Sequence, residues 1–155
     1  MLVEQSETKE ALRCRCGRRG CLETLASGSA ILQRVQQQPA LSGVASLEAV
    51  EAKFRGDDPS VNEIVLQAGH HLGRAIGGLV GTLNIEKIVL TGDVTCFGER
   101  WLDAVRQAMS QAALGRMVQG TQLEIGKLDY RACILGASAY LLLEDYSLLF
   151  PQKEN

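Results

Sequence analysis

The sequence predicts an α/β fold in which several packed helices cover a short sheet with at least two neighbouring parallel strands. Apolar residues recur at helical spacing over five segments, and two short apolar segments, residues 85–91 and 123–125, have strand character. These strands alternate with helices, which is typical of parallel sheets. Two or three strands against five helices make a thin sheet, so we expect the chain to be a piece of a larger fold.

Composition excludes several other classes of protein. The chain has 155 residues, 46% of them hydrophobic, which suits a packed core and excludes disorder as the dominant state. Its 16 basic and 18 acidic residues leave a net charge of −2, so nothing draws the whole chain to nucleic acid or membranes. No apolar stretch reaches the ~18–20 residues of a membrane span. Because the first ten residues are polar and acidic, they predict no signal peptide, and we expect a cytoplasmic protein.

The N-terminal third is expected to contain a loop and two helices. Residues 1–5 suit the end of a strand, and residues 6–20 form a polar loop with Gly17 and Gly20. Residues 21–37 predict one helix with a single buried face, followed by breaks at Pro39 and Gly43. A second, short helix covers residues 47–54 and ends near Gly56.

The clearest element is a long helix over residues 59–83. Asp58 and Pro59 mark its start rather than a catalytic carboxylate pair with Asp57, and Ser60 with Glu63 forms a capping-box pattern. Glycines recur one turn apart on one side, although each destabilises a helix by up to ~1 kcal/mol relative to Ala. They therefore predict close approach of another element in a tightly packed core, at Gly69, Gly73, Gly77 and Gly81.

The remaining elements alternate between strand and helix. A strand over residues 85–91 leads into a turn at Gly92 and Asp93. A helix follows over residues 99–115, then a short strand at residues 123–125 and a last helix over residues 132–143. Of the five cysteines, Cys96 and Cys133 stand alone in apolar surroundings, where we expect inert or core thiols.

The other three cysteines, Cys14, Cys16 and Cys21, crowd into eight positions. In a cytosolic chain, clustered cysteines more often bind a metal than form a disulfide. With glycines between them the thiolates can fold around one ion, and zinc takes four tetrahedral ligands. A fourth ligand must come from elsewhere, because His70 and His71 lie within the long helix, where packing or capping is expected. Reduced buried cysteines and a redox switch remain as alternatives, although a glycine-rich loop is poor core material.

The segment Cys-Arg-Cys-Gly-Arg-Arg-Gly-Cys-Leu-Glu-Thr, residues 14–24, resembles the zinc loop of the ROK family, named for repressors, open reading frames and kinases. Residues 71–93 resemble the long helix of that family running into its C-terminal strand. The resemblance covers about residues 1–145 and only the C-terminal half of a typical member. It implies half of an actin-like, hexokinase-like ATPase fold. Residues 1–155 would then be a single partial domain, with its zinc loop at residues 6–21 and without the upstream lobe or DNA-binding head.

The resemblance assigns roles to four residues. Cys14, Cys16 and Cys21 match the zinc ligands, and Glu23 matches a glutamate that hydrogen-bonds sugar hydroxyls. In the family the fourth ligand is a histidine of a Glu-x-Gly-His motif, about ten or more residues before the first cysteine. Residues 1–13 contain no histidine, so the zinc site is expected to be incomplete, or completed by water or another chain.

The turn after the C-terminal strand distinguishes the branches of the family. In the kinases it is of a Gly-Gly-Gly type whose backbone approaches the nucleotide, whereas here Thr91-Gly92-Asp93 retains one glycine and adds a carboxylate. This departure favours the repressor branch of the N-acetylglucosamine and xylose type. Residues 140–150 also resemble the extended C-terminal helix of those repressors. The catalytic aspartate and phosphate loop of the kinases belong to the other half. No catalytic or cofactor-binding residue is therefore assigned, and enzymatic activity is not expected.

The resemblance thus predicts the effector-binding and oligomerisation part of a sugar-sensing transcriptional regulator. The expected partners are a sugar or sugar-phosphate effector and further copies of the chain, in a dimer or tetramer. DNA would be contacted only through the absent head. An ATP-dependent sugar kinase is the alternative, and a zinc-bound scaffold without a ligand is the second alternative. Without the upstream lobe, we expect uncovered apolar surface on the long or the last helix.

Overall fold

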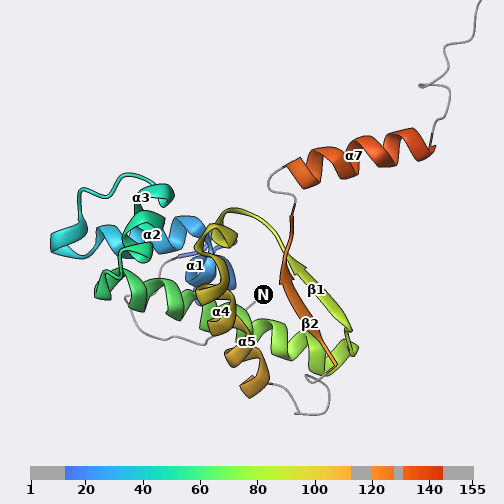
Figure 1. Cartoon of the computed structure of the whole chain (residues 1–155), viewed down its shortest axis with the longest axis horizontal. Coiled ribbons are helices and arrows are strands. Elements are labelled where there is room, and N and C mark those ends of the chain that lie inside the picture. The colour runs from blue at the N-terminus through green and yellow to red at the C-terminus, as the bar shows by residue number, and fades with distance from the viewer. Residues whose placement is uncertain (1–12, 113–119, 128–130, 145–155) are drawn as a thin grey trace, which may run out of the picture.

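Helices dominate the chain, and a two-stranded sheet lies against them (Figure 1). This computed structural model describes residues 13–112, 120–127 and 131–144. The strand end expected at residues 1–5 lies outside them. The order of elements confirms the predicted α/β class: α1 (Leu22–Ala26), α2 (Gly28–Gln36), η1 (Pro39–Leu41), α3 (Leu47–Arg55), α4 (Pro59–Leu83), β1 (Lys87–Leu90), η2 (Asp93–Phe97), α5 (Gly98–Ala112), β2 (Gln122–Ile125) and α7 (Arg131–Glu144).

The single helix predicted over residues 21–37 is wrong, because Ser27 divides it into α1 and α2. Ser27 has an extended backbone, with φ −76° and ψ 158°. Its Oγ accepts a hydrogen bond from the N–H of Ala30 at 3.2 Å and so caps α2. A serine that bonds the backbone locally competes with helix continuation, and apolar periodicity does not reveal this competition.

The start of α4 is set by Asp58 rather than by the predicted capping box of Ser60 and Glu63. Asp58 Oδ1 accepts hydrogen bonds from the N–H groups of Ser60 and Val61, at 3.1 and 3.2 Å. Pro59 occupies the first turn, where its missing N–H does no harm. The neighbouring Asp57, at φ 59°, forms an ion pair of 2.7 Å with Arg100 of α5. The interpretation of Asp57 and Asp58 as a helix-start turn is therefore confirmed.

The glycines of α4 mark where α5 crosses it, as predicted, at three of the four positions. A Cβ at Gly69 would lie 3.1 Å from Trp101 Cδ1, and one at Gly77 would lie 2.8 Å from Ala112 Cβ. Gly73 is in still closer contact with α5. At Gly81, by contrast, a Cβ would meet nothing within 4 Å, so close approach is not the reason for that glycine.

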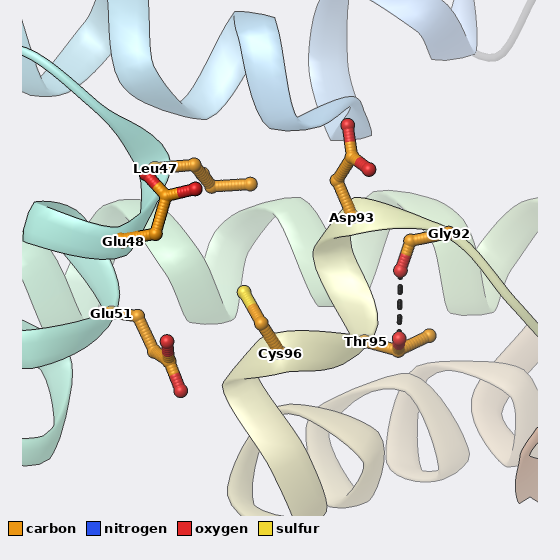
Figure 2. A pocket seen from close by; sticks show the side chains of 7 residues that line it. All are labelled: Leu47, Glu48, Glu51, Gly92, Asp93, Thr95 and Cys96. Carbon is orange, nitrogen blue, oxygen red and sulfur yellow. Dashed lines mark hydrogen bonds between the residues drawn. The ribbon is translucent and has the colours of Figure 1, made fainter. Parts of the chain in front are cut away.

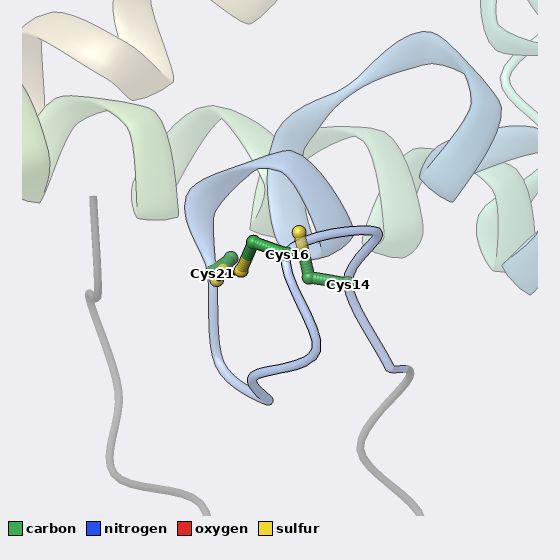
Figure 3. Close-up of side chains that lie close together, drawn as sticks. All are labelled: Cys14, Cys16 and Cys21. Atoms are coloured by element: carbon green, nitrogen blue, oxygen red, sulfur yellow. Dashed lines mark hydrogen bonds between the residues drawn. The ribbon is translucent and has the colours of Figure 1, made fainter.

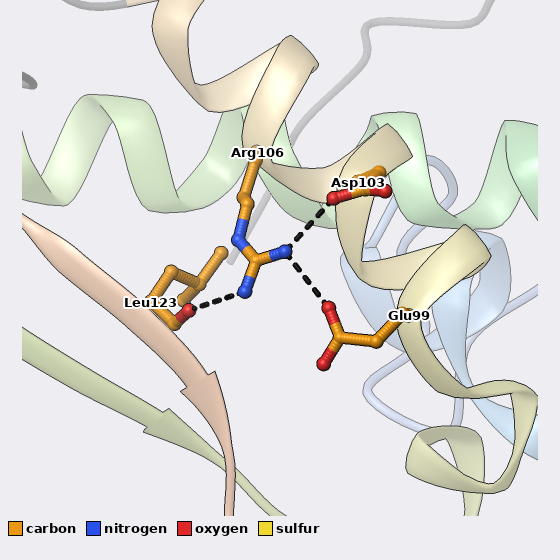
Figure 4. Close-up of polar contacts among 4 residues, drawn as sticks. All are labelled: Glu99, Asp103, Arg106 and Leu123. Carbon is orange, nitrogen blue, oxygen red and sulfur yellow. Dashed lines mark hydrogen bonds and ion pairs between the residues drawn. The ribbon is translucent and has the colours of Figure 1, made fainter.

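The sheet consists of β1 and β2, and its parallel pairing confirms the prediction, with Ile88 opposite Leu123 and Leu90 opposite Ile125. The core lies mainly among the helices, with Leu123 of β2 packed against it, and its largest fully buried side chains include Trp101, Phe54 and Ile31. Arg106 of α5 ties that helix to the sheet by donating from Nη2 to the carbonyl of Leu123 at 3.0 Å (Figure 4).

The predicted turn at Gly92 and Asp93 is the beginning of a short 3₁₀ helix, η2, which leads into α5. Gly92 has φ 106° and Gly98 has φ 68°, values that favour glycine. α5 starts at Gly98, and the end predicted near residue 115 lies outside the described residues.

The last helix, α7, projects from the rest of the described chain (Figure 1). Its apolar side chains are exposed, among them Leu135 at 51%, Leu141 at 58% and Leu143 at 69%. This bears out the expectation of uncovered apolar surface. The side chain of Cys133 lies outside the described part, so its predicted core position stays a prediction. Among the described helices none is long and apolar enough to cross a membrane.

Candidate metal and sugar site

The cysteine loop is folded back on itself by its own backbone. The N–H of Cys14 donates to the carbonyl of Arg18 at 2.8 Å, and the N–H of Gly17 donates to the carbonyl of Cys14 at 2.9 Å. Gly17 and Gly20 have φ values of 85° and 71°, which few other residues adopt. The glycines of the motif therefore serve the reversal that brings its cysteines together.

The three sulfur atoms of Cys14, Cys16 and Cys21 lie within 4.8 Å of one another, and the Sγ atoms of Cys16 and Cys21 are 3.5 Å apart (Figure 3). Zn–S bonds of ~2.3 Å in a tetrahedral site require sulfur separations of about 3.8 Å, so the geometry fits zinc. The predicted clustering of these cysteines is confirmed. No other histidine, cysteine or carboxylate of the described residues joins the group, and His70 and His71 lie elsewhere, in α4.

The thiols of this cluster differ in environment. Cys16 is exposed, and a hydrogen bond from the Arg18 backbone, aided by Cys21 and Cys14, lowers its pKa. Cys21, at the start of α1, is only 7% exposed. Its hydrogen bond to Cys16, together with burial, raises the pKa of Cys21 to about 11. A cation at the centre of the cluster would favour the thiolate form of all three.

Glu23 follows this loop directly, in the first turn of α1, and its side chain is exposed. It lines two cavities, each of about 380 Å³. The first lies at the carboxyl end of β1, where Leu90, Thr91 and Trp101 also contribute. The second is bounded by Arg13, Arg15 and other residues of the cysteine loop and of α2. Glu23 therefore borders open space on both sides.

A third cavity, of about 580 Å³, lies beside the turn after β1 and is acidic (Figure 2). Glu48 and Glu51 of α3 and Asp93 of η2 line it, together with Cys96. Burial, with the nearby carboxylates of Glu51, Asp93 and Glu48, raises the pKa of the Cys96 thiol to about 11. The sequence pointed to Asp93 but not to Glu48 and Glu51. The sequence shows that Glu48 and Glu51 lie three residues apart on the polar side of a short helix. That spacing does not indicate which other residues they face.

Solved structures identify the architecture that this arrangement belongs to. The chain superposes on a ROK family transcriptional regulator described as a homologue of the Escherichia coli MLC protein, with a TM-score of 0.74 and 28% identity over 88% of this chain and 37% of that one. It superposes on the ROK hexokinase of Thermus thermophilus with a TM-score of 0.66 and 28% identity, over 87% of this chain and 45% of that one. The described elements are therefore part of a hexokinase-like, actin-like fold.

The profile of the ROK family matches residues 2–144, and the chain belongs to the ROK family. It is 30% identical over 147 residues to a glucokinase of Halalkalibacterium halodurans, covering 87% of this chain and 44% of that protein. It is 31% identical over 130 residues to the DNA-binding transcriptional dual regulator NagC of Escherichia coli strain K12, covering 79% of this chain and 32% of that protein. The chain thus spans less than half the length of the curated relatives it matches, and these include both a kinase and a regulator.

Proposed function

We propose that the chain is the effector-binding and oligomerisation part of a sugar-sensing ROK transcriptional regulator. The observation that carries this proposal is the acidic cavity at Asp93. In a kinase of this family, the turn after the corresponding strand is expected to approach a nucleotide. Here that turn shares its cavity with Glu48 and Glu51.

Electrostatics makes this cavity a poor nucleotide site. Three carboxylates line it, and none of the described residues around it is a lysine or an arginine, while Arg55 offsets Glu51 only through an ion pair whose arginine side chain is exposed. Two like charges 4 Å apart repel by ~1 kcal/mol in water and by ~4 kcal/mol at the effective dielectric of a protein surface. A polyphosphate carries several such charges. The cavity therefore disfavours ATP without any change of fold, which suits a protein that senses a sugar and does not phosphorylate it.

The sugar site of the proposal is built around Glu23. An exposed carboxylate at the start of a helix can accept hydrogen bonds from two neighbouring sugar hydroxyls. Zinc bound by Cys14, Cys16 and Cys21 would stabilise the folded loop, and it would thereby hold Glu23 in a fixed position in the first turn of α1. The fourth zinc ligand would be water or a group outside the described residues.

In the proposed mechanism a sugar binds near Glu23 in the cytoplasm and shifts the conformation of an oligomer. DNA would be contacted by another part of the regulator, and this chain would supply one wall of the sugar site and an interface between copies. Coupling of this kind requires that the sugar bind one conformation more tightly than the other.

A sugar kinase remains the second candidate, supported by the 30% identity to a glucokinase. The two candidates differ in what the cavity at Asp93 binds. A kinase needs a nucleotide there, and a sensor does not.

Calorimetric titration of the full zinc-loaded chain with candidate ligands separates the sensor from the kinase. Glucose, xylose and N-acetylglucosamine are titrated first, and then the ATP analogue AMPPNP. We expect one of the sugars to bind to the wild type, and Glu23→Gln should weaken that binding at least tenfold. The control is Glu63→Gln, which should leave sugar binding unchanged because Glu63 lines neither cavity of Glu23. Tight AMPPNP binding would favour the kinase, and absence of all sugar binding would favour a zinc scaffold.

A further inference from the structure

The three clustered cysteines differ in how far solvent reaches them. Cys16 is exposed and Cys14 is half-buried, whereas Cys21 is only 7% exposed. Residues 17–19, which follow Cys16, are exposed as well, and a Cβ at Gly17 would meet nothing within 4 Å. A dissolved oxidant can therefore reach Cys16 directly, while Cys21 is covered by the rest of the chain.

Cys21 is held in place by the helix that follows it. It is the residue before α1, and its carbonyl accepts hydrogen bonds from the N–H of Thr24 at 2.9 Å and from Thr24 Oγ1 at 2.8 Å. Cys16 lies instead in the exposed part of the cysteine loop. A movement that brings the two sulfur atoms together therefore falls to Cys16 and its loop, because Cys21 is anchored.

The sulfur atoms of Cys16 and Cys21 are already close, as Figure 3 shows, with their Sγ atoms 3.5 Å apart. A tetrahedral zinc site holds sulfur atoms about 3.8 Å apart, whereas a disulfide joins them at ~2.05 Å. The pair must therefore approach by about 1.5 Å to form that bond. Gly17 and Gly20 lie between the two cysteines and have no side chains to obstruct this approach.

We propose that Cys16 is a site of oxidation by hydrogen peroxide, and that Cys21 converts the product into a disulfide with release of the bound zinc. An accessible cysteine next to a second cysteine is the arrangement through which proteins undergo reversible oxidation. The inference goes beyond the proposed function, because it concerns the metal loop alone and requires no sugar.

The reaction has two balanced steps. The sulfur of Cys16 first attacks one oxygen of the peroxide, so that an S–O bond forms, the O–O bond breaks and one water leaves. The sulfur of Cys21 then attacks the sulfenic acid at Cys16, so that the S–S bond forms, the S–O bond breaks and a second water leaves. Counted as thiols, the two cysteines lose two electrons and two protons, and one peroxide becomes two waters.

Formation of this disulfide removes two metal ligands at once, because zinc binds the thiolate form of cysteine. Of the three sulfur ligands among the described residues, only Cys14 would remain. Zinc should therefore leave the loop as the disulfide forms. A dithiol reductant breaks the S–S bond and returns all three ligands, so the change is reversible.

The test treats the full zinc-loaded chain with hydrogen peroxide, blocks the remaining thiols and digests the product with trypsin. Arginines separate the cysteines of the loop, so each of the three falls on a peptide of its own. We expect mass spectrometry to find the Cys16 peptide joined to the Cys21 peptide, with one zinc ion released per link. Cys16 should react about tenfold faster or more than Cys96, a half-buried thiol of the same chain. Dithiothreitol with added zinc should reverse both changes.

The cysteine variants are compared after removal of zinc, so that a difference in metal content does not affect the result. Cys21→Ser should lower the disulfide yield about tenfold and leave Cys16 as a sulfenic acid, which dimedone traps. Cys14→Ser is the matched control. It also removes one thiol of the cluster, but it should form the Cys16–Cys21 disulfide as the wild type does.

The other outcomes count against separate parts of the proposal. Disulfides that contain Cys14 as often as Cys16 and Cys21, or a Cys16 that reacts no faster than Cys96, would overturn the assignment of the oxidation site. Zinc that stays bound after the disulfide has formed would overturn the release of metal. An untreated chain without zinc would overturn that release together with the metal site. None of these outcomes bears on the proposed function, which sugar binding tests.

Discussion

A Cβ atom at Gly73 of α4 would lie 2.3 Å from the carbonyl oxygen of Val105 of α5. The same atom would lie 2.7 Å from Ala108 Cβ and 3.0 Å from the backbone N of Met109. Since two of these three atoms belong to the backbone, no change of rotamer can make room. The two helices pack backbone against backbone at this point.

Gly73→Ala is therefore expected to destabilise the chain by about 2 kcal/mol or more, since overpacking typically does so by ~1–3 kcal/mol. Gly81→Ala is its matched control on the same helix. A Cβ at position 81 would face open space, so this substitution should leave the stability of the chain unchanged or raise it by up to ~1 kcal/mol. Urea denaturation of both variants measures the difference. Equal stabilities would contradict the close packing of α4 against α5.

Arg106 is half-buried and is expected to contribute to stability, because its Nη2 donates to the Leu123 carbonyl while its Nη1 donates to Glu99 and Asp103 (Figure 4). Arg106→Ala removes the side-chain link between α5 and β2 and should destabilise the chain by about 1–2 kcal/mol. Arg55→Ala removes only an exposed i,i+4 pair and should change stability by ~0.5 kcal/mol or less. Thermal unfolding measures the loss of stability in both variants. An equal loss would show that Arg106 contributes no more than an ordinary surface charge.

Metal removal tests the cysteine cluster. The chain purified with zinc is expected to contain one ion, and Cys14→Ser should lose it, whereas Cys96→Ser should keep it, because Cys96 lies outside the cluster. A strong chelator should lower the melting temperature of the wild type but not that of Cys14→Ser, whose loop already lacks the metal. Elemental analysis and thermal scans give both readouts. Equal zinc content in the two variants would exclude the cluster as the binding site.

The Cys96 thiol should ionise only at high pH, because its pKa is raised to about 11. Burial is the largest cause, and the negative charges of Glu51, Asp93 and Glu48 add to it. The neutral thiol is favoured in the folded chain, so its stabilising effect is complete below the usual thiol pKa near 9.0 and is lost as the pH rises toward 11. The alkylation rate of Cys96, followed by mass spectrometry, should have its midpoint near pH 11. Glu51→Gln should lower that midpoint, and a midpoint near 9 in the wild type would contradict the acidic surroundings.

Self-association is expected through α7, because its described side chains, at residues 134–144, are all exposed, among them Leu141 and Leu143. Helices that are apolar on all sides are normally buried, so copies of the chain should cover one another here. Sedimentation velocity should show a dimer or larger species, and Leu141→Lys together with Leu143→Lys should shift it toward the monomer. A stable wild-type monomer at micromolar concentration would count against this interface.

Much of the fold was predictable because helical and strand periodicities are local properties. The long helix, the parallel pairing of the two strands and the close approach at Gly69, Gly73 and Gly77 were predicted correctly. The errors concern side chains that bond the backbone locally. Ser27 ends one helix and caps the next, and Asp58 replaces the predicted capping box. Such competition depends on which of two hydrogen bonds forms, and apolar patterns carry no information about it.

The family resemblance, the α/β class and the clustering of the three cysteines could be predicted from the chain alone. For the cysteines this is because their spacing within eight residues limits where the sulfur atoms can meet. The surroundings of these residues depend on packing between distant segments, which local patterns do not reveal. The tertiary structure placed Glu48 and Glu51 beside Asp93 from a different helix, and it placed Arg13 and Arg15 around the cavity that Glu23 lines. Charges that are distant along the chain acquire a shared field only when packing brings their helices and loops together, and that field governs which ligand each cavity favours.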